Sequence, residues 1–460
     1  MKNKLFYLIG VATFLCYTST FTSCINGVDD EYLELVNNGG SGNSNKDDEA
    51  IELPDLNGDY VAGGEFELVK MTYNGEELTG KAVNIAADEQ NQTATITLTG
   101  TEQDLTEMLG GLMEFKFTTL SPVPGVKEII LPNVKLYNSG TSYLFKGEVI
   151  EPTYILSYEG TIEDGKMNIN LTHELVGDNP LAGTWILAPL KDTGNSPAYA
   201  PLWFECDSKV KVDLGKIQAG SFGLPVNQPI QGIISLLTGS MSSMIMNGIL
   251  GQNIKVEQLV LNMLRDITAE KSGSIFATYS YSEDVTTPQW SSEMSHNILR
   301  YYYGEEEGKF FVEANADFLA NAIGGLIPSI ATSAPITRAG DPEQTKAIGR
   351  ELVAMLIPLL RDGIPCEYTF DNVQNGELAI NIEGECLRKL LLKVLELAND
   401  EYAKTFVEEF INSSLGDFAG NIKLLLQNAP AGLTYYEGTS PENYSGECGP
   451  AKLGLKFVRP

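Results

Sequence analysis

The feature that most constrains this chain is a hairpin pattern that occurs twice. Residues 154–171 read YILSYEGTIEDGKMNINL and residues 366–382 read CEYTFDNVQNGELAINI, with Asp164-Gly165 and Asn375-Gly376 between the alternating runs. Alternation of apolar and polar residues indicates half-buried strands, and Asp-Gly and Asn-Gly favour tight hairpin turns. The pattern therefore predicts two β-hairpins. It favours one β architecture that is used twice, and two unrelated hairpins are the alternative.

Each half of the chain also opens with a glycine two residues before an aromatic residue, at Gly58-Asp59-Tyr60 and at Gly183-Thr184-Trp185. Short alternating runs separated by turn signals fill residues 55–178, so this part is predicted to be an all-β module. About eight short strands in a segment of this length suit a closed antiparallel barrel or a sandwich.

Asn179-Pro180 marks a boundary, and a second set of predicted strands occupies residues 181–460. Helical periodicity interrupts these strands in three insertions, at about residues 225–268, 317–363 and 385–428. The predicted fold class is therefore α+β. It consists of two consecutive, mainly antiparallel β-barrel modules, and the second module carries the large helical insertions.

The N-terminus has the features of an export signal. Lys2 and Lys4 precede an apolar stretch at residues 5–16, which is shorter than the roughly 20 residues that span a bilayer. The following Phe21-Thr22-Ser23-Cys24 resembles the lipobox of bacterial lipoproteins, although leucine is usual where Phe21 stands. The resemblance implies that residues 1–23 are removed, that Cys24 is acylated and that residues 24–54 tether the chain to a membrane. An ordinary signal peptide that is cut nearby is the alternative.

The formal net charge of −30 at pH 7 bears on the partners of this chain. Nucleic acid and anionic membrane surfaces carry negative charge, so a protein of this charge is repelled by both. We therefore expect no nucleic-acid partner. A solvated acidic surface accounts for the charge without a dedicated binding site.

The longest uncharged stretch runs from residue 217 to residue 254. Three interpretations are open: a buried helical layer, a methionine-rich wall of an apolar ligand pocket, and membrane insertion. Glycine, serine and asparagine interrupt the stretch too often for a spanning helix. The candidate residues of an apolar wall are Ile233, Leu237, Met241, Met244 and Ile245.

Motifs of catalysis are sparse. The chain has two histidines, His173 and His296, and neither has the spacing to Cys, Asp or Glu that a zinc site needs. It contains no Gly-x-Ser-x-Gly elbow, no His-Glu-x-x-His pair and no phosphate-binding glycine loop. We therefore expect no enzyme activity, no metal and no cofactor. A glycoside hydrolase with two carboxylates is left open, because acidic residues are abundant and no pair stands out.

The lipoprotein-like start, the paired β modules and the Gly183-Thr184-Trp185 opening are similar to Bacteroidetes lipoproteins of unknown function with calycin-like (lipocalin-like) β-barrels. In that superfamily the tryptophan of the first strand packs near a basic residue of the last strand. The resemblance implies that Trp185 contacts Arg459 or Lys456, a contact worth about 0.5–2 kcal/mol. It also implies an interior cavity for an apolar ligand.

These observations predict a non-catalytic cell-envelope lipoprotein, anchored by lipid to the outer membrane, whose second module binds an apolar or amphiphilic small ligand. Whether the chain faces the cell surface is left open. The alternative is a protein- or glycan-interaction module at that surface, for which the candidate aromatic residues are Tyr301, Tyr302, Tyr435 and Tyr436. A glycoside hydrolase is the third interpretation.

Overall fold

The structure is a computed structural model of the 460-residue chain. It describes residues 56–62, 68–88, 92–104, 106, 116–192, 197–199, 201–208, 210–219, 222–239, 242–282, 284–291, 297, 299–314, 351, 354–372, 376–401, 404, 407–408, 411–412, 419–433 and 448–460.

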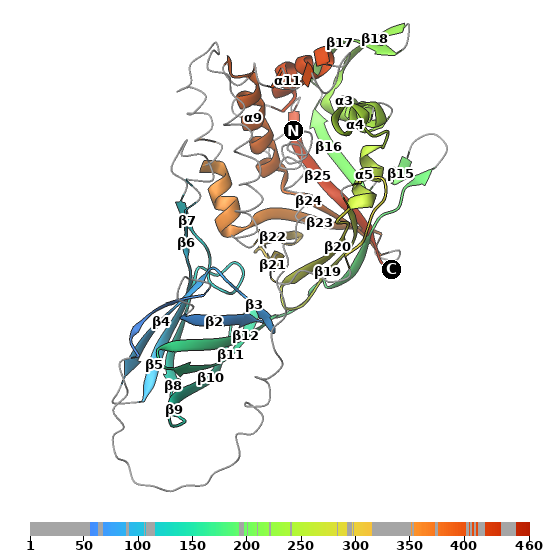
Figure 1. The fold of residues 1–460 in the computed structure, drawn as a ribbon. Helices are drawn as coiled ribbons and strands as arrows, with labels where there is room; N and C mark the ends of the chain where they lie inside the picture. Colours follow the sequence, from blue (N-terminus) through green and yellow to red (C-terminus); the bar gives the residue numbers. More distant parts are fainter. Residues whose placement is uncertain are drawn as a thin grey trace.

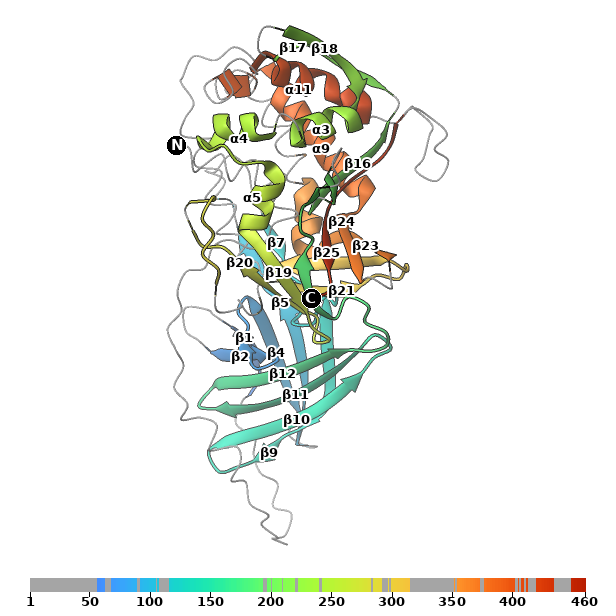
Figure 2. The same cartoon turned by 90° about the vertical axis from the view of Figure 1, so that its right-hand side faces the viewer.

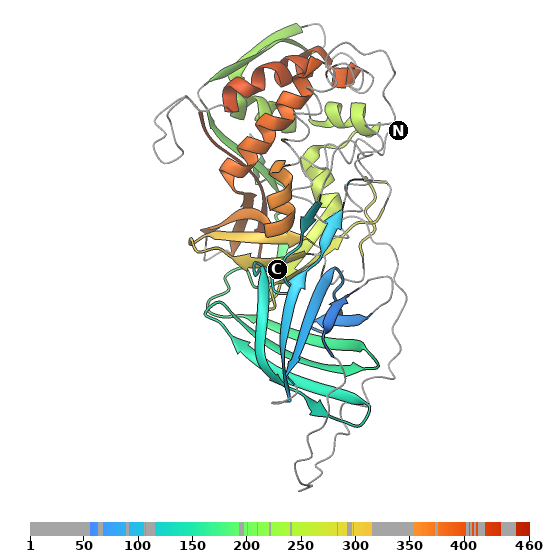
Figure 3. The same cartoon turned by 90° about the vertical axis from the view of Figure 1, so that its left-hand side faces the viewer.

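The chain forms a mixed α+β fold in which strands predominate (Figure 1). A first module of strands lies at one end of the molecule and a closed barrel lies in the middle. Helices α3 (Ile230–Thr238), α9 (Gly384–Asn399) and α11 (Ala419–Leu433) lie at the other end. Figures 2 and 3 show the same order from two further sides.

The first module consists of two main sheets. One contains β1 (Gly58–Val61), β4 (Lys81–Asp88), β5 (Thr93–Gly100) and β8 (Glu128–Lys135), in that order. The other contains β3 (Glu76–Glu77), β2 (Val69–Tyr73), β12 (Lys166–Leu175), β11 (Tyr154–Glu163), β10 (Ser142–Ile150) and β9 (Tyr137–Asn138). A short ribbon, β6 (Glu102–Asp104) with β7 (Lys116–Thr118), is separate from both.

Both sheets of the first module turn one face to a shared core. In β5 every second residue is buried, and β12 alternates between exposed and buried residues along its whole length. Tyr73, Ile96 and Leu156 are fully enclosed in this core. Side chains alternate across a strand, so the period of two in the sequence determines which of them point inward.

Strand pairing does not close the first module into a barrel in the part of the chain that the structure describes. A parallel bridge between Ala62 and Val69 joins the sheets on one side, but no pairing joins β8 to β10 on the other. The register between β5 and β8 shifts opposite Pro132 and Asn133, where Pro132 has no N–H to donate and Asn133 has a φ of +54°. The barrel that the sequence predicts here is thus replaced by two facing sheets, because β8 and β10 are edge strands that do not pair with each other.

The second module contains a closed antiparallel barrel of eight strands. They follow chain order around the ring: β13 (Gly183–Leu187), β19 (Leu264–Ala269), β20 (Ser274–Tyr279), β21 (Leu299–Tyr303), β22 (Lys309–Ala314), β23 (Ile364–Asn372), β24 (Glu377–Ile382) and β25 (Cys448–Val458). The last strand closes the ring, because β25 pairs with β24 on one side and with β13 on the other. Further along, β25 also pairs with β16 (Leu202–Ser208).

The first predicted insertion contains α3, α4 (Ser242–Leu250) and α5 (Val256–Met263), and the third contains α9 and α11. Of the second, the structure describes residues 351 and 354–363, and residues 354–362 are helical. Two short ribbons accompany them, β14 (Lys191–Asp192) with β15 (Pro197–Tyr199) and β17 (Lys211–Ala219) with β18 (Phe222–Pro229). No helix among the described residues is long and apolar enough to cross a bilayer.

The helices share the core of the barrel. Ile233 of α3 and Leu387 of α9 are buried in the same cluster as Trp185 and Phe457 of the barrel. Helix α9 begins after Glu383, whose carboxylate accepts a hydrogen bond from the backbone N–H of Cys386 at 2.8 Å. Such a cap satisfies one of the backbone donors that a helix start leaves unpaired.

Both predicted hairpins are present, but they do not occupy the same place. The first is β11 with β12, and its turn residues Asp164 and Gly165 have φ values of +48° and +73°, as a tight hairpin turn requires. The second is β23 with β24, whose Gly376 has a φ of +63°. In the first module β12 is the last strand and pairs in parallel with β2, whereas in the second module β25 follows β24.

Candidate functional site

The two modules meet at a polar junction. The turn between β19 and β20 rests against β2 and β12 of the first module, and its carbonyl groups accept three hydrogen bonds. The carbonyl of Lys271 accepts the backbone N–H of Leu175 at 2.8 Å. The carbonyl of Ser272 accepts Oη of Tyr73 at 2.9 Å and Nδ1 of His173 at 2.8 Å. Polar groups of the two modules therefore satisfy one another's hydrogen-bonding capacity at a site away from water.

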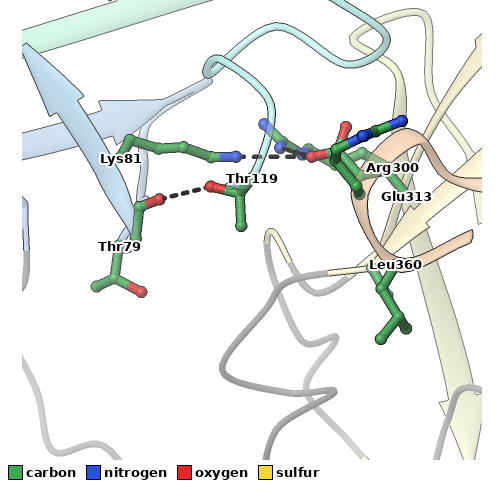
Figure 4. Close-up of a pocket in the computed structure, with 9 residues that line it drawn as sticks. Thr79, Lys81, Thr119, Arg300, Glu313 and Leu360 are labelled. Atoms are coloured by element: carbon green, nitrogen blue, oxygen red, sulfur yellow. Dashed lines mark hydrogen bonds and ion pairs between the residues drawn. The ribbon is translucent and has the colours of Figure 1, made fainter. Parts of the chain in front are cut away.

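Three charged side chains are buried at this junction. Lys81 of β4, Arg300 of β21 and Glu313 of β22 are each no more than 5% exposed. Oε1 of Glu313 accepts a hydrogen bond from Nη2 of Arg300 at 2.7 Å and lies 3.6 Å from Nζ of Lys81 (Figure 4). Arg300 also donates to the carbonyl of Pro122, and Lys81 donates to that of Leu120 at 3.0 Å.

One ion cluster therefore bridges the modules, because Lys81 comes from the first module and the other two charges come from the barrel. Charges leave water at a high free-energy cost, which only close pairing and further hydrogen bonds offset. The cluster meets that condition only when the modules lie in this relative orientation. Its net charge of +1 contrasts with the −30 of the whole chain.

A small pocket opens beside the ion cluster, as Figure 4 shows. The space open to the centre of a water-sized sphere is about 10 Å³, which is room for about one water molecule. Oε2 of Glu313 is buried and has no hydrogen-bond partner among the described residues. A water molecule therefore fits both the size and the chemistry of the pocket. The lining consists of Thr79, Gly80, Lys81, Thr119, Arg300, Glu313, Ala314, Leu360 and Arg361.

His173 lies near the end of β12 and is 3% exposed. Its ring stacks on Tyr73, with 5.7 Å between ring centroids, and lies 5.5 Å from the ring of Tyr154. Burial lowers the pKa of His173 to about 4; the hydrogen bond to Ser272 opposes this shift and the charge of Arg300 adds to it. The ring is therefore neutral at pH 7.

The linker between the modules is fixed by two tyrosines of the barrel. Asn179 donates through Nδ2 to Oη of Tyr301 at 2.7 Å, and Oη of Tyr303 donates to Oδ1 of Asn179. Oη of Tyr301 also donates to the carbonyl of Glu270 at 2.7 Å, and Oη of Tyr303 accepts the backbone N–H of Leu181 at 3.2 Å. The boundary that Asn179-Pro180 marks is thus an ordered connection.

Sequence reasoning missed the junction, although one signal was available. Strands β21 and β22 form a hairpin. In its register Arg300 lies directly opposite Glu313. Opposite charges at facing positions attract one another, and on a buried face they mark a cross-strand ion pair. Lys81 gave no comparable signal, because its partner Glu313 lies more than two hundred residues further along the chain.

The residues of the candidate apolar wall are spread over different surroundings. Ile233 is fully buried in the core, while Leu237 and Ile245 are partly buried against it. Met244 is 47% exposed, and Met241 lies outside the described residues. The junction pocket is formed by none of them.

The structure places Arg459 over the ring of Trp185, with 3.8 Å between Cζ and the ring centroid. Lys456, the other cation considered, lies over Trp203 at 5.8 Å. Nε1 of Trp185 donates to the carbonyl of Leu181 at 2.7 Å. Gly183 has a φ of +117°, and a Cβ atom there would lie 2.3 Å from Nη1 of Arg459, so glycine leaves the space that the guanidinium occupies.

Several other candidate residues lie elsewhere. Tyr301 is fully buried, and the ring of Tyr302 packs over Gly125 of the first module and stacks on Phe311 at 5.0 Å. Neither is therefore an exposed aromatic residue. The lipidation candidate Cys24 lies outside the described residues, as do His296, Tyr435 and Tyr436.

Comparison with family models, with curated proteins and with solved structures finds no match for this chain. Within the described ranges, no group of three or more His, Cys, Asp or Glu side chains is arranged to hold a metal ion. The class that the coordinates define is thus a mixed α+β protein with a closed antiparallel barrel.

Proposed function

We propose that this chain is a lipid-anchored protein of the outer membrane that binds an apolar or amphiphilic small ligand in its second module and catalyses no reaction. The first 23 residues would direct export, and Cys24 would carry the lipid. The ligand would lie between the barrel and helices α3 and α4.

The observation that carries this proposal is the apolar surface of α3 and α4. Neither helix contains a charged residue, in a chain that is 20% charged. Leu237 and Ile245 are only partly buried against the barrel core, and Met244 is 47% exposed. Apolar side chains that a fold leaves half-covered favour an apolar ligand or partner.

The pair of Trp185 and Arg459 supports the calycin-like origin of the barrel. The tryptophan belongs to the first barrel strand, and the arginine directly follows the last one. We extend the proposal to the first module, in which β1, β4, β5 and β8 face β10, β11, β12 and β2 around one core. It would be a calycin-like barrel that has opened between β8 and β10.

A titration with an apolar fluorescent dye, N-phenyl-naphthylamine, tests the binding site. Met244→Gln and Leu237→Gln should each raise the dissociation constant about tenfold, because the loss of one apolar contact of this size is worth about 1.5 kcal/mol. Val394→Gln is the matched control, since Val394 is 42% exposed on α9. Equal affinity in all variants would place the dye elsewhere and contradict the proposed site.

An interaction module is the second candidate, and one observation favours it. Tyr137 and Leu144 face each other across β9 and β10 and are 51% and 41% exposed. Paired exposed apolar residues of this kind suit contact with another envelope protein or with a glycan. A pull-down and a glycan array that lose their signal with Tyr137→Ser would favour this function over ligand binding.

Nothing at the junction supports a glycoside hydrolase. Such an enzyme needs two carboxyl groups about 5–10 Å apart in an open cleft. The junction pocket has one carboxylate in its lining, Glu313, and that carboxylate is engaged by Arg300 and Lys81.

A further inference from the structure

His173, the buried histidine at the module junction, has no role in the proposed function. Nδ1 of His173 lies 2.8 Å from the carbonyl oxygen of Ser272, which can only accept, so Nδ1 carries the proton of the neutral ring. Nε2 is buried and has no hydrogen-bond partner among the described residues. A second proton on the ring would thus be placed where no acceptor receives it.

Apart from the carbonyl of Ser272, the described groups that face His173 offer no buried negative charge to pair with its charged form. From β2 and β11 the ring meets Tyr73 and Tyr154, and from β21 the guanidinium of Arg300 lies 5.1 Å from the same Tyr73 ring. The facing turn adds Glu270 and Lys271, which are both exposed to solvent and of opposite sign.

The ion cluster makes a positive charge on His173 still less favourable. Lys81 and Arg300 share one carboxylate, Glu313, so the buried part of the junction already has an excess of one positive charge. A proton on His173 would add a second. At acid pH, positive charge therefore accumulates at the surface where the modules meet. Because this surface is buried, that charge raises the free energy of the closed state.

We infer that the junction is an acid-sensitive switch, in which protonation of His173 separates the first module from the barrel while each module stays folded. His173 is the group that titrates, and the hydrogen bonds to Lys271 and Ser272 are the contacts that open. The separated state exposes the ends of β2 and β12, at Tyr73, His173 and Leu175, which the turn between β19 and β20 covers at neutral pH.

The sign and the size follow from linkage. The pKa of His173 is about 4 in the closed junction and 6.5 for an exposed histidine, so the closed state keeps its full stability above pH 6.5 and loses it as the pH falls towards 4. These two values make closure at most about 70-fold less favourable at pH 4.5 than at pH 7.5, because Tyr73 and Tyr154 of the first module still pack on the ring in the separated state.

Hydrogen exchange measured by mass spectrometry on the full chain tests the switch. The reporter is the amide of Leu175, which donates to Lys271 across the junction. Its protection factor, corrected for the intrinsic pH dependence of exchange, should fall between pH 7.5 and 4.5 by up to about 70-fold. Amides of β5 and β24 inside the two modules should change less than threefold.

Variants identify the titrating group. His173→Gln and His173→Phe cannot be protonated. The ratio of the Leu175 protection factors at pH 7.5 and pH 4.5 should therefore stay near one in both variants, whatever the absolute stability of each. His296→Gln, which replaces the other histidine, should behave as the parent chain. An unchanged ratio in the parent, an equal loss in β5 and β24, or the same acid response in both His173 variants would each overturn the inference.

Discussion

Glu313→Gln is the most informative single change, because Glu313 is the shared acceptor of the ion cluster. The glutamine keeps the shape of the side chain and one acceptor oxygen, and it removes the negative charge. Arg300 and Lys81 would then be left 4% and 5% exposed without a carboxylate. The change therefore isolates the electrostatic contribution of one side chain.

The magnitude follows from the distances. At an effective dielectric constant of about 20, a separation of 2.7 Å from Arg300 corresponds to about 6 kcal/mol of attraction, and 3.6 Å from Lys81 to about 5 kcal/mol. Desolvation offsets much of this, and the loss of one partner from a buried pair destabilises by about 3–5 kcal/mol. Because glutamine still accepts hydrogen bonds, we expect about 3 kcal/mol.

Guanidinium denaturation followed by tryptophan fluorescence measures the loss, since Trp185, Trp203 and Trp290 all belong to the barrel module. Glu306→Gln on the same β21–β22 hairpin is the control. The Glu306 side chain is 73% exposed in its pair with Lys309 and should contribute less than about 0.5 kcal/mol. If both variants shift the midpoint equally, the argument for a stabilising buried cluster fails.

Three further changes test other parts of the account. Gly183→Ala should lower the free energy of unfolding by about 1–3 kcal/mol, because the new Cβ meets Arg459. Gly177→Ala is the control: nothing lies within 4 Å of its new Cβ, so it should lower the free energy of unfolding by about 1 kcal/mol in the same assay. Asn179→Ala should cost about 1–3 kcal/mol and speed proteolytic cleavage of the linker, because the hydroxyls of Tyr301 and Tyr303 each lose one hydrogen-bond partner. Cys24→Ala should abolish incorporation of labelled palmitate and release the protein from the membrane fraction; retention of both would contradict lipidation.

Local features of the fold could be predicted from the sequence. The alternation at residues 154–171 and the Asp164-Gly165 turn specify a hairpin through contacts between neighbours in the chain, and β11 and β12 form it. For the uncharged stretch at residues 217–254, a buried helical layer was one of the three interpretations left open, and Ile233 of α3 lies in the core of the second module.

The arrangement of strands could not be predicted in the same way. A period of two says which face of a strand is buried, but it does not say which strand lies beside it. The parallel pairing of β2 with β12 and the open side at β8 depend on strands that are distant in the sequence. Similar hairpins therefore occupy different places in the two modules.

The junction could not be predicted from the sequence for a related reason. A buried lysine such as Lys81 looks like any surface lysine until its partner is known, and that partner comes from another module. His173 sits at an alternating strand position, where burial alone does not reveal that Ser272 of the barrel is its hydrogen-bond acceptor. Long-range polar contacts of this kind are visible only in three dimensions.

Native mass spectrometry of the full chain, purified from membranes in mild detergent, tests the proposed function most directly. A bound apolar or amphiphilic small molecule should add a discrete mass to the protein, and Met244→Gln should reduce the fraction that carries it while Val394→Gln leaves that fraction unchanged. A protein that never carries such a mass, and that takes up none from an added lipid extract, would contradict the account.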